Sequence, residues 1–247
     1  MLAAVVAAFD VAVAIAAPLK PHTHLGWMPT GIGSTVGAAA AAARMLGLDA
    51  AGVRSAMGLA AMGASIGRQA VTDKASGKNV LAGQAARRAL DCALLTADGI
   101  EGAPSFWGGP CGVNALLAGG KGDIEAELAN LERRFAIAET SVKPYPCCRL
   151  THAAIDLALD LAAEEPGLGE KIERIEVAST PAVEQMVGGP FAPGDNPRVA
   201  AWKGPSTASS AAVWRRSRRS CARPARAAEL PHDHLRPAIT AEASAGA

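Results

Sequence analysis

Residues 28–65 read MPTGIGSTVGAAAAAARMLGLDAAGVRSAMGLAAMGAS, and this stretch decides the fold class. Alanine is the strongest helix former, so the first half predicts a helix that Ser34 or Thr35 caps and Gly47 ends. Asp49 then begins a second helix. Because the side chains are small and glycines lie among them, we expect these helices to pack closely.

The whole chain shares this small-residue character. It has 247 residues, of which 50% are hydrophobic but only 4% aromatic, with 26 Gly and 16 Pro. Such a composition excludes collagen, a coiled coil and wholesale disorder. The length allows one or two domains with a hydrophobic core.

The apolar N-terminus, up to Pro18, predicts a buried helix. No Lys or Arg precedes the apolar run and Asp10 interrupts it, which argues against a signal peptide. The run is also too short to span a bilayer, so no membrane partner is expected.

Cysteine, histidine and glycine spacings predict neither a metal nor a cofactor. The five cysteines include no CxxC pair, which favours a reduced, cytoplasmic setting. His22 and His24 lack a third ligand at a sensible spacing. The glycines of residues 31–37 depart from the dinucleotide-binding pattern, and SGKN at 76–79 lacks the rest of a phosphate-binding loop.

Helical signals continue to about residue 140 and then change. Residues 81–100 and 124–135 have helical spacing, and Lys78 lies at the entrance of the first of these helices. From Ser141 the chain is Pro-rich, after which Thr151 begins a helix and residues 171–180 alternate like a half-buried strand. The sequence therefore predicts a second, α+β domain beginning near Ser141.

Several residues near these helix starts suit an anionic substrate. A helix N-terminus carries partial positive charge and free N–H groups, so a lysine beside it predicts a carboxylate site. The candidates are Lys78, Lys143, Tyr145, Arg149, Thr151 and His152.

Three blocks of the sequence resemble the MmgE/PrpD family, the family of 2-methylcitrate dehydratase and cis-aconitate decarboxylase. KPYPCCRLTHAAID at 143–156 is similar to the segment that opens the family's smaller domain. Residues 28–65 resemble its H-x-T-G followed by an Ala-rich helix, and residues 76–95 resemble its Lys-bearing loop and helix. The resemblance extends from about Leu2 to Val199.

The resemblance implies a mainly α fold in which a large all-helical domain, residues 1–140, precedes the start of a smaller α+β lid, residues 141–201. It implies a cytoplasmic homodimer without metal, iron–sulfur cluster or other cofactor. The implied catalytic residues are Lys78, Lys143 and His152. The implied substrate-binding residues are Thr30, Gly31, Tyr145 and Arg149.

The implied activity is that of a carbon–oxygen lyase that dehydrates a small tricarboxylate such as 2-methylcitrate, in propionate catabolism. A base removes a proton next to a carboxylate while an acid assists the departing hydroxyl. Isomerisation or epimerisation, decarboxylation, and a non-catalytic role as a dimerising fragment remain alternatives.

The sequence departs from the family pattern at three places. Met28 stands where the family's H-x-T-G histidine is expected, and an upstream helical segment with acid/base residues is expected to be missing. Residues 202–247 hold 8 basic and 3 acidic residues, net +5, against 16 and 20, net −4, in residues 1–201. We predict that this basic tail is aberrant, disordered and the product of a frameshift.

These departures predict a fragment, truncated at both ends, that can lack activity. Although the tail is basic, no fold is predicted to present it, so no nucleic-acid partner is expected.

Overall fold

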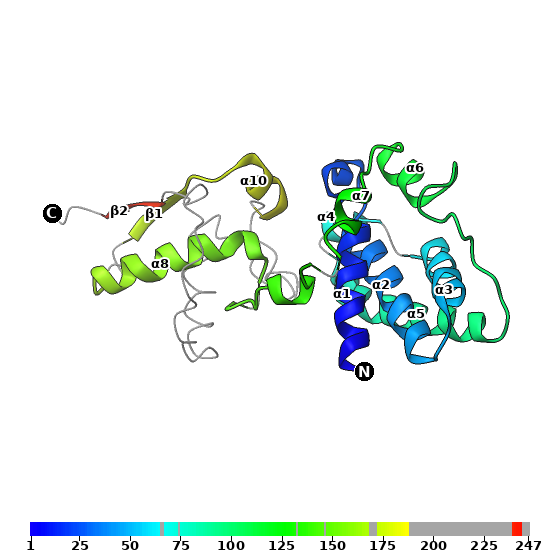
Figure 1. The fold of residues 1–247 in the computed structure, drawn as a ribbon. Coiled ribbons are helices and arrows are strands. Elements are labelled where there is room, and N and C mark those ends of the chain that lie inside the picture. Colours follow the sequence, from blue (N-terminus) through cyan, green and yellow to red (C-terminus); the bar gives the residue numbers. More distant parts are fainter. Residues whose placement is uncertain are drawn as a thin grey trace. The chain divides into compact units, whose positions relative to one another are not determined.

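The computed structural model describes residues 1–64, 67–73, 75–131, 133–145, 147–167, 172–187 and 239–243. It divides into two compact units, Met1–Ser141 and Val142–Ala247. The described part is mainly helical, which confirms the predicted fold class (Figure 1). The lid domain predicted for residues 141–201 stays a prediction.

Helix α2 lies at the centre of the first unit. It packs against α1, α3 and α5, and α3 also contacts α5 (Figure 1). The helices of this unit are α1 (Leu2–Ala16), α2 (Pro29–Met45), α3 (Ala50–Met62), α4 (Gln69–Thr72), α5 (Leu81–Ala97), α6 (Val113–Ala118) and α7 (Glu125–Leu128). Short 3-10 helices connect them: η1 (Lys20–Leu25), η2 (Ser76–Val80) and η3 (Ala136–Glu139).

Two glycines bring α1 and α2 into close contact. A Cβ added to Gly33 would lie 2.6 Å from the backbone oxygen of Ala12, and one added to Gly37 would lie 2.8 Å from the Ala12 Cβ. The two glycines are four residues apart, so they lie on the same face of α2. The close helix packing predicted from the small residues therefore depends on positions where any side chain would collide with α1.

The core of this helical unit is built largely from small side chains. Two clusters of buried residues join α2, α3 and α5: Ala39, Ala60, Ala89 and Cys92 in one, and Ala43, Ala56 and Ala93 in the other. A third, larger cluster consists of Ile15, Leu19, Trp27, Ile32, Val36, Val113, Leu117 and Ala118. Larger apolar side chains are thus gathered in one part of the core, and alanines fill the rest.

Helix starts follow the sequence signals only in part. Asp49 caps α3, because its carboxylate accepts a hydrogen bond from the Gly52 N–H at 2.8 Å. Helix α2, in contrast, starts at Pro29, before the predicted caps, because proline at the first position already has a helical φ. Thr35 lies inside the helix, where its hydroxyl donates to the Gly31 carbonyl at 2.6 Å.

Two further expectations need correction. Helix α7 ends at Leu128, well before residue 135. The cause lies at Asn130, because its side-chain amide donates to the Ala126 carbonyl at 2.9 Å and its backbone N–H donates to the Glu127 carbonyl. The N-terminal helix α1 is buried on one face only, and Leu2 on its other face is 81% exposed. Among the helices that the structure describes, none combines the length and apolarity needed to cross a membrane.

The described residues of the second unit form one long helix and a two-stranded sheet, besides shorter helices. These described elements are η4 (Arg149–Thr151), α8 (His152–Glu164), β1 (Ile172–Val177), α10 (Pro181–Val187) and β2 (Ile239–Ala243). The helix predicted from Thr151 and the strand predicted within residues 171–180 are both present. Strands β1 and β2 pair antiparallel, with Ile175 opposite Ala241.

Strand β2 falls inside the basic tail, residues 202–247, for which the sequence analysis predicts disorder. Its five residues differ from that prediction because they pair with β1. The rest of the tail lies outside the described residues.

We predict that Gly37→Ala lowers the free energy of unfolding by about 1–3 kcal/mol, because the new methyl group collides with α1. The matched control is Gly83→Ala in α5, where an added Cβ meets no atom within 4 Å. That control gains helix propensity alone and is expected to stabilise the protein by about 0.5–1 kcal/mol. Urea unfolding of both variants measures the difference, and equal stabilisation by the two would contradict the close contact.

Candidate functional site

The predicted site residues fall in both units. Thr30, Gly31 and Lys78 belong to the first unit. The second unit holds Lys143, Tyr145, Arg149 and His152, at and just before the start of α8.

In the first unit, the predicted residues lie at two helix starts. Thr30 and Gly31 form part of the first turn of α2, where Thr30 is exposed and Gly31 is buried. The residue before this helix, Met28, makes no side-chain capping bond. Lys78 is half-buried in η2, directly before α5, as the sequence predicts.

In the second unit, side chains tie the Pro-rich segment to the start of α8. The Lys143 ammonium donates to the Cys147 carbonyl at 2.9 Å. The Thr151 hydroxyl donates to the Cys148 carbonyl at 2.7 Å, and the Cys147 thiol lies 3.1 Å from the same hydroxyl. Because the Thr151 hydroxyl donates to a carbonyl that precedes the helix, its side chain does not cap α8.

His152 is the first residue of α8 and is only 5% exposed. Neither of its ring nitrogens has a hydrogen-bond partner among the described residues. Burial lowers the pKa of His152 below its ordinary value of 6.5, and the Arg149 charge lowers this pKa further. The imidazole is therefore neutral at neutral pH and able to accept a proton.

Tyr145 packs directly against this imidazole. The two ring centroids lie 5.2 Å apart and the ring planes are at 89°, an edge-to-face arrangement. The Tyr145 hydroxyl donates to the Asp156 carboxylate at 2.5 Å. Burial and this carboxylate raise the pKa of Tyr145 far above its usual value, so the phenol keeps its proton.

The start of α8 thus combines a neutral proton acceptor with positive charge. The Arg149 and Lys143 side chains are exposed, and both lie close enough to His152 to oppose its protonation. Cations at a helix N-terminus attract carboxylates, and a neutral imidazole can remove a proton from a bound molecule. This arrangement is suited to proton transfer on an anionic substrate.

Sequence reasoning missed one residue of this group, Asp156. It lies four residues after His152 on α8, so both side chains project from the same face of the helix. The spacing H-x-x-x-D was a usable signal. What the sequence could not indicate is that Tyr145 reaches Asp156 from outside the helix.

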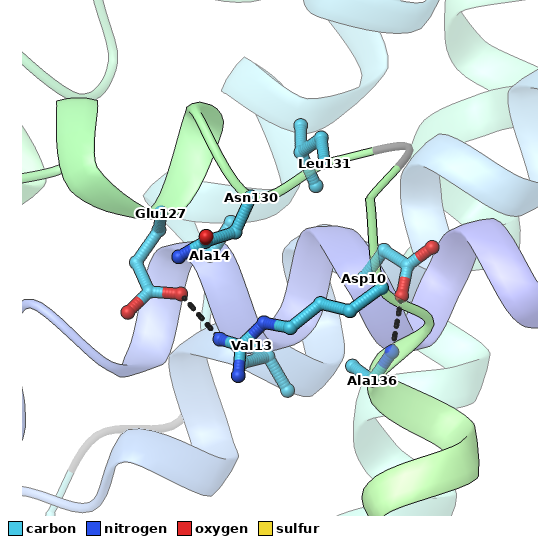
Figure 2. A pocket seen from close by; sticks show the side chains of 8 residues that line it. Asp10, Val13, Ala14, Glu127, Asn130, Leu131 and Ala136 are labelled. Carbon is cyan, nitrogen blue, oxygen red and sulfur yellow. Dashed lines mark hydrogen bonds and ion pairs between the residues drawn. The ribbon is translucent and has the colours of Figure 1, made fainter.

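The first unit also has a small recess that includes none of the predicted site residues (Figure 2). Its volume, including open solvent, is about 220 Å³. The polar groups pair with one another: the Asp10 carboxylate accepts from the Ala136 N–H at 2.7 Å, and Arg134 lies 3.3 Å from Glu127. The first contact attaches η3 to α1 and the second joins α7 to the segment after it, so we interpret the recess as structural.

Within the described ranges, no group of three or more His, Cys, Asp or Glu residues is placed to hold a metal ion.

A model of the MmgE/PrpD N-terminal domain matches residues 1–125, slightly more than half of the chain. The matched region includes Thr30, Gly31 and Lys78, and it ends before Lys143. No curated protein matches the chain.

We predict that the second unit loses stability as the pH falls below about 6.5. Because the folded pKa of His152 lies below the ordinary value of 6.5, the unfolded chain binds the proton first. The stability is fully present above the unfolded pKa and is lost as the pH falls through the folded one.

His152→Phe is the matched variant, since it fills a similar volume and cannot titrate. Urea unfolding followed by the NMR signals of α8, from about pH 7.5 to about pH 5, measures the slope for both proteins. An identical slope in the wild type and in His152→Phe would exclude His152 as its source.

Proposed function

Because the chain belongs to the MmgE/PrpD family, we propose that it is a carbon–oxygen lyase that dehydrates a small tricarboxylate such as 2-methylcitrate, in propionate catabolism. The single observation that carries the proposal is the neutral, buried imidazole of His152 beside the cations Lys143 and Arg149. This combination meets the two needs of such a dehydration, which are a base and positive charge for the carboxylates.

Substrate binding uses the positive charge at the start of α8. Arg149 can form paired hydrogen bonds with a carboxylate, because its guanidinium presents two parallel N–H donors. The N-terminus of α8 adds partial positive charge. No side chain caps it, and the His152 N–H donates to the Arg149 carbonyl. Tyr145, which stays protonated, adds an aromatic wall beside the base.

The chemical step begins with His152. Its imidazole takes a proton from the carbon next to a substrate carboxylate, and the electron pair of that C–H bond forms the new double bond. The neighbouring C–O bond breaks, and the hydroxyl leaves as water after receiving a proton from the Lys143 ammonium. Proton exchange with solvent restores both groups, so the products are one water molecule and an unsaturated tricarboxylate.

Isomerisation, epimerisation or decarboxylation on this scaffold would begin at a similar carbon centre but would release no water. Identification of the product by NMR distinguishes these reactions from dehydration. Lys78, Thr30 and Gly31 remain proposed site residues of the first unit on the strength of the family resemblance.

We expect the purified chain to convert 2-methylcitrate to an unsaturated product, followed by the ultraviolet absorbance of the new double bond. Lys78→Ala or Lys143→Ala should each cost about 2–4 kcal/mol of transition-state stabilisation, because charge developing on the substrate loses a cation. The matched control is Lys121→Ala, which removes an exposed lysine outside the proposed site. Equal turnover after both site lysines are replaced, or no turnover by the wild type, would refute the assignment.

We further propose that the protein acts as a cytoplasmic homodimer. Val5 and Phe9 of α1 are 42% and 37% exposed and, with Leu2, share one face of the helix. Exposed apolar faces of this kind are typical of protein–protein contacts. Phe9→Glu is expected to convert a dimer to a monomer in light scattering, whereas Leu46→Glu, an exposed position on α2's C-terminal end, should not. A dimer that survives Phe9→Glu would exclude this face.

A further inference from the structure

We propose that Asp156 is a positioning residue that, through Tyr145, fixes the ring of His152 for proton transfer. The inference rests on the proposed function, in which His152 is the base. Its geometry is a chain of two contacts: the Asp156 carboxylate accepts the Tyr145 hydroxyl at 2.5 Å, and the Tyr145 ring meets the His152 ring at 5.2 Å.

Helix α8 holds His152 and Asp156 at a fixed separation. His152 and Asp156 stand one turn apart on α8, so the distance between their backbones is set by the helix itself. Tyr145 comes from the segment before the helix and spans the two positions, with its hydroxyl on Asp156 and its ring on His152. A hydrogen bond to a charged carboxylate is short and strong, which suits it to hold a phenol ring in one orientation.

Besides Tyr145, the described groups that influence the imidazole are the backbone of Cys147, which raises its pKa, and the charged side chains of Arg149, Lys143 and Asp156. Histidines that act as bases are usually oriented by a hydrogen bond to one ring nitrogen, whereas both nitrogens of His152 lack such a partner among the described residues. The edge-to-face contact with Tyr145 therefore contributes to holding the ring in one orientation. A buried polar group without a partner is costly, which favours a functional reason for this arrangement.

Asp156 and Asp160 act on Tyr145 to different extents. Asp160 also acts on Tyr145 through its charge, but its effect is smaller than that of Asp156, which contributes both a hydrogen bond and a charge. Lys143 and Arg149 act on His152 through their charges. Asp160→Asn is accordingly the matched control, since it removes the same charge one turn farther along α8 without removing the hydrogen bond.

The chain has a single tyrosine, so an absorbance titration of phenolate reports Tyr145 alone. Asp156→Asn is expected to shift this titration to lower pH, and Asp160→Asn to shift it less. NMR then tests the next contact. The His152 ring protons should show a ring-current shift from Tyr145 in the wild type and in Asp160→Asn, and lose it in Asp156→Ala, which removes the acceptor, and in Tyr145→Phe.

Kinetics test the positioning role itself. Asp156→Ala and Tyr145→Phe should each lower kcat by roughly 10–100-fold with little change in KM, because a misplaced base slows the chemical step. The double variant should lose no more than either single variant, since both break one unit. Asp156→Glu, which keeps the carboxylate at this exposed position, should recover part of the rate and serves if Asp156→Ala does not fold.

The outcomes separate the two proposals. A wild type without lyase activity overturns the proposed function, while the tyrosine titration and the ring-current shift still decide whether Asp156 fixes the two rings. An unchanged His152 ring-current shift in Asp156→Ala overturns the positioning role, whatever the activity. Additive losses of kcat in the double variant would also overturn it.

Discussion

The close approach of α1 and α2 is the constraint on which the first unit depends. At Gly33 and Gly37 the two helices come so near that a Cβ would overlap α1. With α1 held on this face, α2 packs its alanines against α3 and α5 on other faces. Each alanine buries little apolar area, so short-range dispersion contacts must carry a larger share of the stabilisation than in a core of large side chains.

In the second unit, polar side chains gather at the start of α8. In the first unit, the buried clusters consist of apolar side chains. The start of α8 is held by hydrogen bonds to backbone carbonyls from Lys143 and Thr151. These bonds place the chain before the helix so that Tyr145 covers His152. Leaving a buried polar group unpaired costs about 1–3 kcal/mol, and His152 bears such a cost on both ring nitrogens among the described residues. A cost of this size is tolerated most readily at a site that binds or reacts.

Most helices were predictable because their signals are local. The Asp49 cap of α3, the apolar spacing of residues 81–97 and the helix from Thr151 each depend on contacts within a few residues. The errors also have local causes that compete with those signals. Pro29 starts α2 before Ser34 and Thr35, and the Asn130 side chain diverts the bonds that would extend α7.

The sequence by itself determined the mainly helical class, the Ala- and Gly-rich packing, and the family to which the chain belongs. It also identified Lys143, Tyr145, Arg149 and His152 as neighbours along the chain. Only the tertiary structure decided that His152 is buried with neither ring nitrogen hydrogen-bonded to a described residue, and that Tyr145 is tied to Asp156. The physical reason is that helix formation depends on neighbouring residues, whereas burial and the orientation of a ring depend on side chains brought together from different elements.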